Sequence, residues 1–258
     1  MPSTYAHHRF GEQVAPLLPL QARRSARQFR RLYDVGLHGP DIFFYHNILY
    51  KDRIVSLAKD THALSGQAFF TGACAKLRQE PNEAALAYLY GMLAHYCLDS
   101  VVHPFVLEQS ADGQVGHTEL ETEFDRYLLQ LDGNRRTNAL DLREELKLTP
   151  GECRTVAGFY DIGSMSVRGS VKRMAFWVKI LSMPNGAKRR IVEKCAGKKL
   201  GAFFMNRTPN KNCRHLDEPM LELYNRALEI FSAMVEALTA HLEQEAPLGE
   251  LFEATFSG

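Results

Sequence analysis

The sequence predicts an all-α fold, a multi-helix bundle packed around one core. Two observations predict this fold class. Apolar residues recur three and four positions apart along most of the chain, whereas the strict alternation typical of half-buried strands is rare. The chain has 258 residues, 45% of them hydrophobic, so it can bury a sizeable core. No linker, repeat or low-complexity tract divides it, and a single domain spanning residues 1–258 is expected.

The N-terminal third is expected to consist of short helices. Helical spacing of apolar residues indicates four of them, at residues 10–20, 21–33, 48–59 and 66–78. Between the second and third, the sequence VGLHGPD at residues 35–41 indicates a loop, because glycine and proline are typical of turns.

The longest helix is expected to begin after Asn82, whose side chain can accept hydrogen bonds from the first free N–H groups of a helix. It should end at His103, because the residue before a proline, here Pro104, disfavours helical geometry. Two further helices are indicated at residues 117–131 and 218–243.

Residues 84–106 are apolar enough to span a membrane, but three ionisable residues argue against a span. His95 and Asp99 lie inside the stretch and His103 lies near its end. An ionisable residue in the middle of a bilayer is costly. We therefore expect a buried core helix that carries polar groups for a reason.

The overall composition is that of an ordinary globular protein, with 24% charged residues and a net charge of +1. This balance gives no general attraction to nucleic acid or membranes, and no stable nucleic-acid partner is expected. The five cysteines are scattered without a CxxC pair, which is typical of reduced thiols. The first residues lack a basic region followed by an apolar stretch, so a cytoplasmic location is expected.

Histidines and acids recur at four-residue spacing in the central helices. His95, Asp99 and His103 would share one helix face, and His117 and Glu121 repeat the spacing on the next helix. Imidazole and carboxylate are the ligands expected for zinc in a site without thiolates. A catalytic zinc ion takes about three protein ligands, so five candidates indicate at least two ions in a cleft between core helices. The alternative is a set of core histidines paired with acids.

This pattern, within HYCLDSVVHP and HTELE, resembles the signature of the zinc-dependent phospholipase C family, whose wider relatives include single-strand-specific zinc nucleases. The resemblance extends to Asp41 in GPDIFFY and His62 in DTHALSGQAFF. It also reaches His7 in TYAHHRFG, where His8 is the alternative. The specific motifs lie within about residues 1–130, and the helices that follow are expected to complete the bundle.

The resemblance implies a ligand set for each ion. The first ion would be held by Asp41, His62, His95 and Asp99. The second would be held by His103, His117 and Glu121. A third would use His7, a bridging Asp99 and the N-terminal amine. Because the chain begins Met-Pro, two zinc ions are expected and three are the alternative.

Zinc at these residues would activate water for hydrolysis of a phosphodiester, since a bound metal lowers the pKa of its water to about 7. The resemblance favours Asp41 as the catalytic residue that takes the proton, although the residues alone also allow a ligand or a turn residue after Pro40. His38 and His46 are expected at the surface or behind the ligands. His215 and His241 are expected to be structural or exposed.

Residues 168–199 carry ten basic residues and one acid, with apolar residues between them. This stretch could make peripheral membrane contact with anionic phospholipid, bind nucleic acid, or form a solvated helix face with an aromatic residue tucked into the core. It does not choose a substrate.

Three functions therefore remain open. The favoured one is phospholipase C-like hydrolysis of a phospholipid or similar phosphodiester. The second is a metal-dependent nuclease or other phosphoesterase, and the third is a non-catalytic, metal-stabilised helical interaction protein. A nuclease should place stacking aromatics beside a basic groove, whereas a phospholipase should have an apolar rim at the metal cleft. Tyr33 and the aromatic residues 43–45 could serve either purpose, or simply the core.

Overall fold

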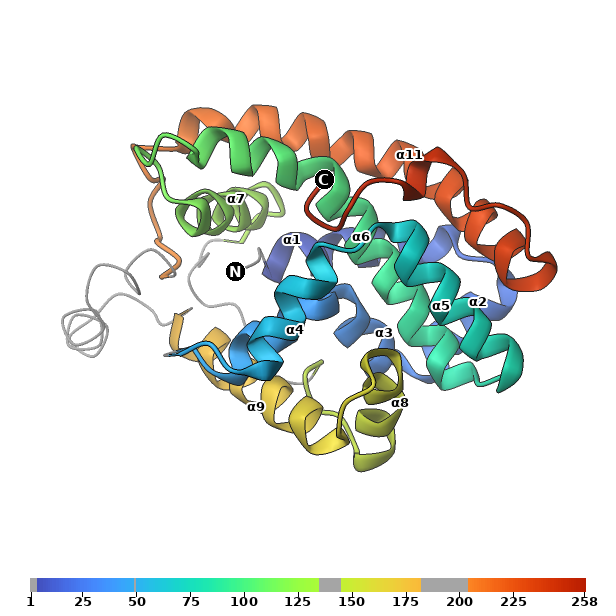
Figure 1. Ribbon diagram of the computed structural model, residues 1–258. Helices are drawn as coiled ribbons and strands as arrows, with labels where there is room; N and C mark the ends of the chain where they lie inside the picture. Colours follow the sequence, from blue (N-terminus) through green and yellow to red (C-terminus); the bar gives the residue numbers. More distant parts are fainter. Residues whose placement is uncertain (1–3, 49, 135–144, 182–203) are drawn as a thin grey trace.

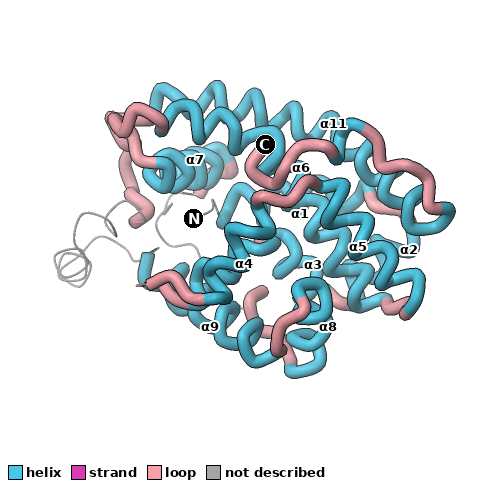
Figure 2. The backbone as a smooth tube through the Cα atoms, viewed as in Figure 1, coloured by secondary structure: helices cyan, strands magenta, loops and turns pink. Residues whose placement is uncertain are grey.

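The computed structural model describes residues 4–48, 50–134, 145–181 and 204–258 (Figure 1). Within these ranges the chain is helical, without strands, and its β pairing is one isolated bridge between Ser65 and Thr255 (Figure 2). The all-α prediction is therefore confirmed. The α-helices are α1 (Thr4–Val14), α2 (Leu20–Gln28), α3 (Arg30–Leu37), α4 (Arg53–His62), α5 (Gly66–Gln79), α6 (Glu83–Ser110), α7 (His117–Leu131), α8 (Pro150–Tyr160), α9 (Ser164–Leu181) and α11 (Asp217–Gln244). Short 3₁₀-helices are η1 (Ala15–Leu17), η2 (Gly39–His46), η3 (Arg214–Leu216) and η4 (Glu250–Phe252).

Helix α6 forms the centre of the fold, with α3, α2 and α11 packed against it. Asn82 caps it as predicted, because its side-chain oxygen accepts hydrogen bonds from the N–H groups of Ala84 (2.9 Å) and Ala85 (3.1 Å). Among the described residues, α6 is the one helix long and apolar enough to cross a membrane. However, 78% of its apolar window is buried inside the protein, which agrees with the predicted core helix.

Helices α3 and α6 cross with their backbones in contact. A Cβ atom on Gly91 would lie 2.3 Å from the carbonyl oxygen of Tyr33, and one on Gly36 would lie 2.6 Å from that of Tyr88. Both positions therefore require glycine. This close approach brings the chain that follows α3 alongside the middle of α6.

The prediction of a loop at residues 35–41 is wrong, because α3 covers the first part of this stretch and η2 the last part. Gly39 adopts a φ of 50°, and a Cβ atom there would meet the His95 ring at 2.4 Å. Pro40 lies in the first turn of η2, where a missing N–H costs nothing. The glycines and proline thus serve close packing, and Asp41 is held on a helical turn against α6.

The predicted end of the central helix at His103 is also wrong. Helix α6 contains Pro104 and continues to its last residue, Ser110. A proline inside a helix costs about 3 kcal/mol. The continuation allows Val106 to be buried at 1% exposure, and burial of apolar side chains stabilises the last turns despite that cost.

The other expected helices agree in part. Residues 66–78, 117–131 and 218–243 correspond to α5, α7 and α11 to within one residue at each end. In contrast, α1 begins before residue 10 and ends before the prolines at 16 and 19, and α4 begins only after Asp52. The carboxylate of Asp52 accepts hydrogen bonds from the first N–H groups of α4, and this sets its start.

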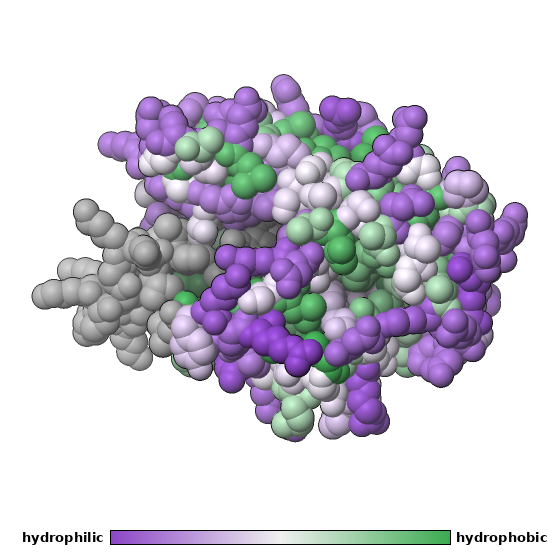
Figure 3. All heavy atoms as spheres, in the orientation of Figure 1, coloured by the Kyte–Doolittle hydropathy of each residue, from purple (hydrophilic) through white to green (hydrophobic). Residues whose placement is uncertain are grey.

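The C-terminal helices lie on opposite sides of α6, with α11 along one side and α8 and α9 on the other (Figure 1). After α11 the chain returns across α6 and α5, where the Phe256 ring packs on Tyr96, with 4.9 Å between centroids. Phe256 also lies 6.4 Å from the His62 ring and 6.1 Å from the His95 ring. On the face shown in Figure 3, the surface is mainly polar and its apolar atoms form small separate groups.

Candidate metal centre

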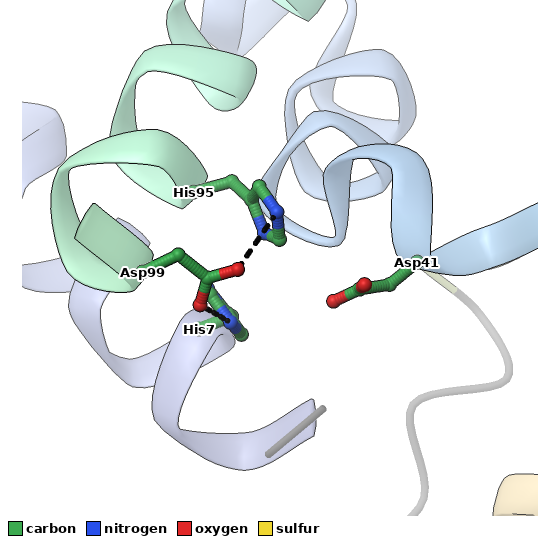
Figure 4. A group of neighbouring side chains, drawn as sticks. All are labelled: His7, Asp41, His95 and Asp99. Carbon is green, nitrogen blue, oxygen red and sulfur yellow. Dashed lines mark ion pairs between the residues drawn. The ribbon is translucent and has the colours of Figure 1, made fainter. Parts of the chain in front are cut away.

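Predicted ligands from four elements meet beside the middle of α6. His7 comes from α1, Asp41 from η2, His62 from the end of α4, and His95 and Asp99 from α6. We call these five residues the deep group. Nitrogen and oxygen atoms of four of them, all except His62, lie within 4.8 Å of one another. Figure 4 shows His7 and His95 directed at Asp99, with Asp41 approaching from the opposite side.

Asp99 connects two histidines of the deep group. Its Oδ1 lies 3.1 Å from Nε2 of His7, and its Oδ2 lies 3.2 Å from Nε2 of His95. Asp41 pairs with His62 instead, with 3.0 Å between Oδ1 and Nε2. Nε2 of His62 also lies 3.9 Å from Oδ2 of Asp99. The structure thus places His7 next to Asp99, in one group with Asp41 and His95.

Backbone carbonyl groups orient two of the histidines. Nδ1 of His62 donates a hydrogen bond to the Ala58 carbonyl oxygen (2.7 Å), and Nδ1 of His95 donates one to that of Leu37 (3.2 Å). A proton on Nδ1 leaves Nε2 as the nitrogen that faces the carboxylates. This arrangement is the usual support of a metal-binding histidine.

Asp125 on α7 fixes the position of His7. Its two carboxylate oxygens accept hydrogen bonds from the backbone N–H groups of Tyr5 (3.0 Å) and Ala6 (2.8 Å) at the start of α1. The neighbouring His8 points elsewhere, with its Nδ1 3.1 Å from a carboxylate oxygen of Glu145. His7 and not His8 therefore faces the deep group.

The sequence analysis did not identify Asp125. The signal was present, because Asp125 continues the four-residue spacing of His117 and Glu121 along one face of α7. Burial raises the pKa of Asp125 to about 7, although the two backbone N–H groups oppose this rise. A carboxyl group buried here is consistent with a role in holding α1.

A second set of predicted ligands lies where α6 and α7 face each other. We call His103, His117 and Glu121 the outer group. The Nε2 atoms of the two histidines are 3.0 Å apart, and Nε2 of His117 lies 3.2 Å from Oε1 of Glu121. The side chains of His103 and His117 are 16% and 29% exposed. The outer group is therefore more accessible from solvent than the deep group, in which His7, Asp41 and His95 are buried.

The deep group contains a charged pair, Asp41 and His62, and a neutral histidine, His95. Burial would raise the pKa of Asp99, but His95 and His7 hold it well below its usual range. Burial would likewise lower the pKa of His62, but Asp41 raises it to about 9. Burial lowers the pKa of His95 to about 4, so this ring is neutral at pH 7.

The deep group fits a bound cation. Because His95 is neutral with its proton on Nδ1, its Nε2 lone pair faces a carboxylate oxygen 3.2 Å away, an arrangement that a cation between them would stabilise. Nε2 of His95 and Oδ2 of Asp41 are both buried without a hydrogen-bond partner. Ligand atoms around a tetrahedral zinc ion lie about 3.4 Å apart, close to the separations found here. The nitrogen and oxygen donors also suit zinc.

Both groups open into one cleft with a volume of about 500 Å³. Its described lining includes Phe44 and Ala63 from the walls, and Thr255 and Ser257 from the C-terminal segment. Lys59 is the one lysine or arginine among the described residues that line this cleft. Of the aromatic residues 43–45, only Phe44 lines the cleft, and the other two are buried in the core.

The remaining histidines are distributed as follows. His38 is fully buried beside the deep group, which agrees with a place behind the ligands rather than at the surface. His46 is partly exposed and its Nδ1 lies 2.9 Å from Asp52. His215 is exposed, whereas the buried His241 donates from Nδ1 to the Ala246 carbonyl oxygen. Neither of the last two lies in either ligand group.

A helical protein with two such groups at one cleft defines a candidate multinuclear metal centre. Comparison with protein families identifies it further, because the family model for zinc-dependent phospholipase C matches residues 6–156. The chain belongs to this family. The matched region contains every predicted ligand and also Asp125. Comparisons with curated proteins and with solved structures gave no match.

Proposed function

We propose that the protein hydrolyses a phospholipid at the bond between phosphorus and the diacylglycerol oxygen. Family membership supports a zinc-dependent phosphodiesterase. The observation that carries the finer proposal is the single cleft, in which the deep group and the outer group lie beside Phe44 and Ala63. A phosphodiester group in this cleft would contact both sets of ligands.

The residues of the two groups would hold the zinc ions. We propose one ion at the deep group and one at the outer group, and His7 next to Asp41 also allows a third. When bound, such ions would lower the pKa of a water molecule to about 7 and neutralise charge on the phosphoryl oxygens. The close packing of α3 on α6 and the cap provided by Asp125 would keep the ligands in place.

Asp41 is the proposed catalytic residue. Burial would raise its pKa, but His62 holds it below its ordinary value, so the carboxylate is ionised at neutral pH. Its Oδ2 has no hydrogen-bond partner and can take a proton. The water oxygen forms a bond to phosphorus while Asp41 takes the proton. The bond to the diacylglycerol oxygen then breaks, and the proton passes to that oxygen, so the reaction consumes one water.

The lining of the cleft favours a lipid over a nucleic acid. Single-stranded nucleic acids are bound by basic grooves with several stacking aromatics. Here Phe44 is the one aromatic residue and Lys59 the one lysine or arginine among the described lining residues. Phe44 and Ala63 would contact the glycerol and the first acyl carbons of a phospholipid, and the charged lining residues other than Lys59 belong to the two ligand groups.

The test is hydrolysis by zinc-loaded protein of three substrates: a short-chain phosphatidylcholine, single-stranded DNA and bis(p-nitrophenyl) phosphate. We expect release of diacylglycerol and phosphocholine, with little cleavage of DNA. Asp41→Asn should lose hydrolysis by at least about 100-fold, the scale of general acid–base catalysis, and its zinc content is measured alongside because Asp41 also belongs to the deep group. Asp60→Asn, at an exposed position on α4, is the matched control and should match the wild type.

Two results would contradict the proposal. Cleavage of DNA without release of diacylglycerol would identify a nuclease. If zinc-loaded protein cleaves none of the three substrates, the metal centre has a structural role. Elemental analysis of the same samples separates an inactive protein from one that has lost its zinc.

A further inference from the structure

A second cavity lies between α8, α9 and the segment that precedes α8. Its volume is about 400 Å³. Four of its lining side chains are basic: Lys147, Arg168, Lys172 and Lys179. No acidic side chain is among the described residues that line it. The charge of this groove therefore selects an anionic ligand.

The same groove has an apolar component. Leu146, Leu148 and Phe176 line it together with the basic side chains. Phe176 is 56% exposed, and Met165, near the start of α9, is 71% exposed. The sequence analysis allowed for an aromatic residue tucked into the core, and Trp177 does pack there. Phe176 instead faces outward, where water contact is unfavourable for it.

These residues follow one stripe of α9. Met165, Arg168, Lys172, Phe176 and Lys179 are spaced three, four, four and three positions apart, so they share one face of the helix. All five are exposed. The opposite face contains the buried residues that attach α9 to the core. The exposed stripe therefore combines basic residues, which are attracted to anionic lipids, with two large apolar side chains that can enter the membrane interface.

The position of α9 links this stripe to the metal centre. Helix α9 packs against η2, the element that carries Asp41. At Gly169 a Cβ atom would lie 3.9 Å from the His46 ring of η2. Helix α9 also lies beyond residues 6–156, the part that matches the family. Of the basic stretch at 168–199, residues 182–199 lie outside the described part of the chain and contribute nothing to this argument.

We propose that the α9 stripe and its groove dock the protein on an anionic phospholipid bilayer. The four basic side chains contact lipid phosphates, and Phe176 and Met165 enter the boundary between headgroups and acyl chains. A nucleic-acid surface would use the charges and could stack one base on Phe176, but it would leave the exposed Met165 without a role. Docking requires no hydrolysis, so this proposal is tested separately from the proposed activity.

The experiment is co-flotation of the full-length protein with vesicles of phosphatidylcholine alone or with about one quarter phosphatidylserine. We expect binding to the anionic vesicles only, weakened by salt, because exposed charges are screened. Each basic residue near an anionic membrane changes partitioning about fivefold. The double variant Arg168→Glu/Lys172→Glu should therefore bind at least about 25-fold more weakly. Phe176→Ser should also weaken binding.

Matched controls separate the stripe from general surface charge. Arg24→Glu/Arg27→Glu makes the same charge change on the exposed face of α2, and Leu20→Ser removes an apolar side chain that is 57% exposed. Both controls should bind like the wild type, and unchanged zinc content and thermal melting should show that every variant folds.

Three outcomes would overturn the proposal. The first is that the wild type does not float with anionic vesicles, and the second is that the two double variants lose binding equally. In the third, Arg168→Glu/Lys172→Glu loses binding to a fluorescent oligonucleotide but not to vesicles, which would make this face a nucleic-acid surface.

Discussion

The deep group and the outer group contain the same residue types but differ in how they are assembled. The outer group comes from two consecutive helices, and its histidines are only 14 residues apart. The deep group joins α1, η2, α4 and α6, and its His95 is fully buried. A group assembled by helix packing depends on residues far from it, whereas a group assembled locally depends mainly on its own side chains. Three predictions test this difference, and a fourth compares Asp99 with a buried carboxyl group outside both groups.

The largest effect is expected from Asp99→Ala, which removes the carboxylate shared by His7 and His95. Without it, Asp41 is the one carboxylate left among the histidines of the deep group, and His7 and His95 lose their ion-pair partner. We expect loss of deep-group zinc and a fall in hydrolysis of more than about 100-fold, because even partners behind the ligands contribute 10–100-fold. Zinc analysis and hydrolysis assays check this. Asp60→Ala is the exposed control, and a wild-type zinc content in Asp99→Ala contradicts the prediction.

A smaller effect is expected from Asp125→Ala, which touches no ligand but frees the start of α1. We expect stability to fall by about 1–2 kcal/mol, as for other helix caps. Zinc affinity of the deep group should fall about tenfold while the outer group keeps its ion. Zinc titration and thermal melting measure the two effects.

Asn82→Ala provides the comparison for that variant, because it removes a cap from α6 at an exposed position. It should lose about 1 kcal/mol of stability but no zinc affinity. If both variants lose zinc affinity equally, Asp125 acts through overall stability and not by placing His7.

A chelator should remove zinc in two phases, since the outer group is more exposed than the deep group. His117→Ala should abolish the fast phase and leave the slow one. Stopped-flow detection with a chromophoric zinc chelator measures both phases. His215→Ala, an exposed histidine outside both groups, should retain both phases. Persistence of the fast phase in His117→Ala would assign it to the deep group.

The smallest effect concerns a buried carboxyl group that lacks a histidine partner. Burial, with a contribution from Glu123, raises the pKa of Asp217 to about 7, although Arg126 opposes the rise. The folded protein thus keeps this proton to higher pH than the unfolded chain does. Stability from this group is present below about pH 4 and is lost as pH rises through about 7.

Asp217→Asn should therefore melt higher than the wild type at pH 8 and similarly at pH 4. We expect a difference in Tm of about 2–4 °C at pH 8, measured by thermal melting across this range. Parallel melting curves for the two proteins between pH 4 and 8 would show that Asp217 ionises normally. The contrast with Asp99, whose pKa is lowered by histidines, would then be lost.

The sequence predicted the helical elements best where their ends depend on local chemistry. Asn82 caps α6, and α7 begins at His117, as expected. Prediction failed where glycine or proline has a tertiary role. Gly36 indicated a turn but serves contact between α3 and α6, and Pro104 indicated a helix end but lies inside α6. Helix α8 was not predicted, and α9 was expected only as one of three interpretations of residues 168–199.

By itself, the sequence determined the helical fold class, the family and the outer group, because four-residue spacing places side chains on one helix face without reference to the rest of the chain. Only the tertiary structure decided that His7 and not His8 faces Asp99, that Asp125 holds α1, and that both groups share one cleft. Helical periodicity gives the direction of a side chain from its own helix. The distance between two helices depends instead on packing contacts made elsewhere in the chain, such as that of Gly36 with Gly91.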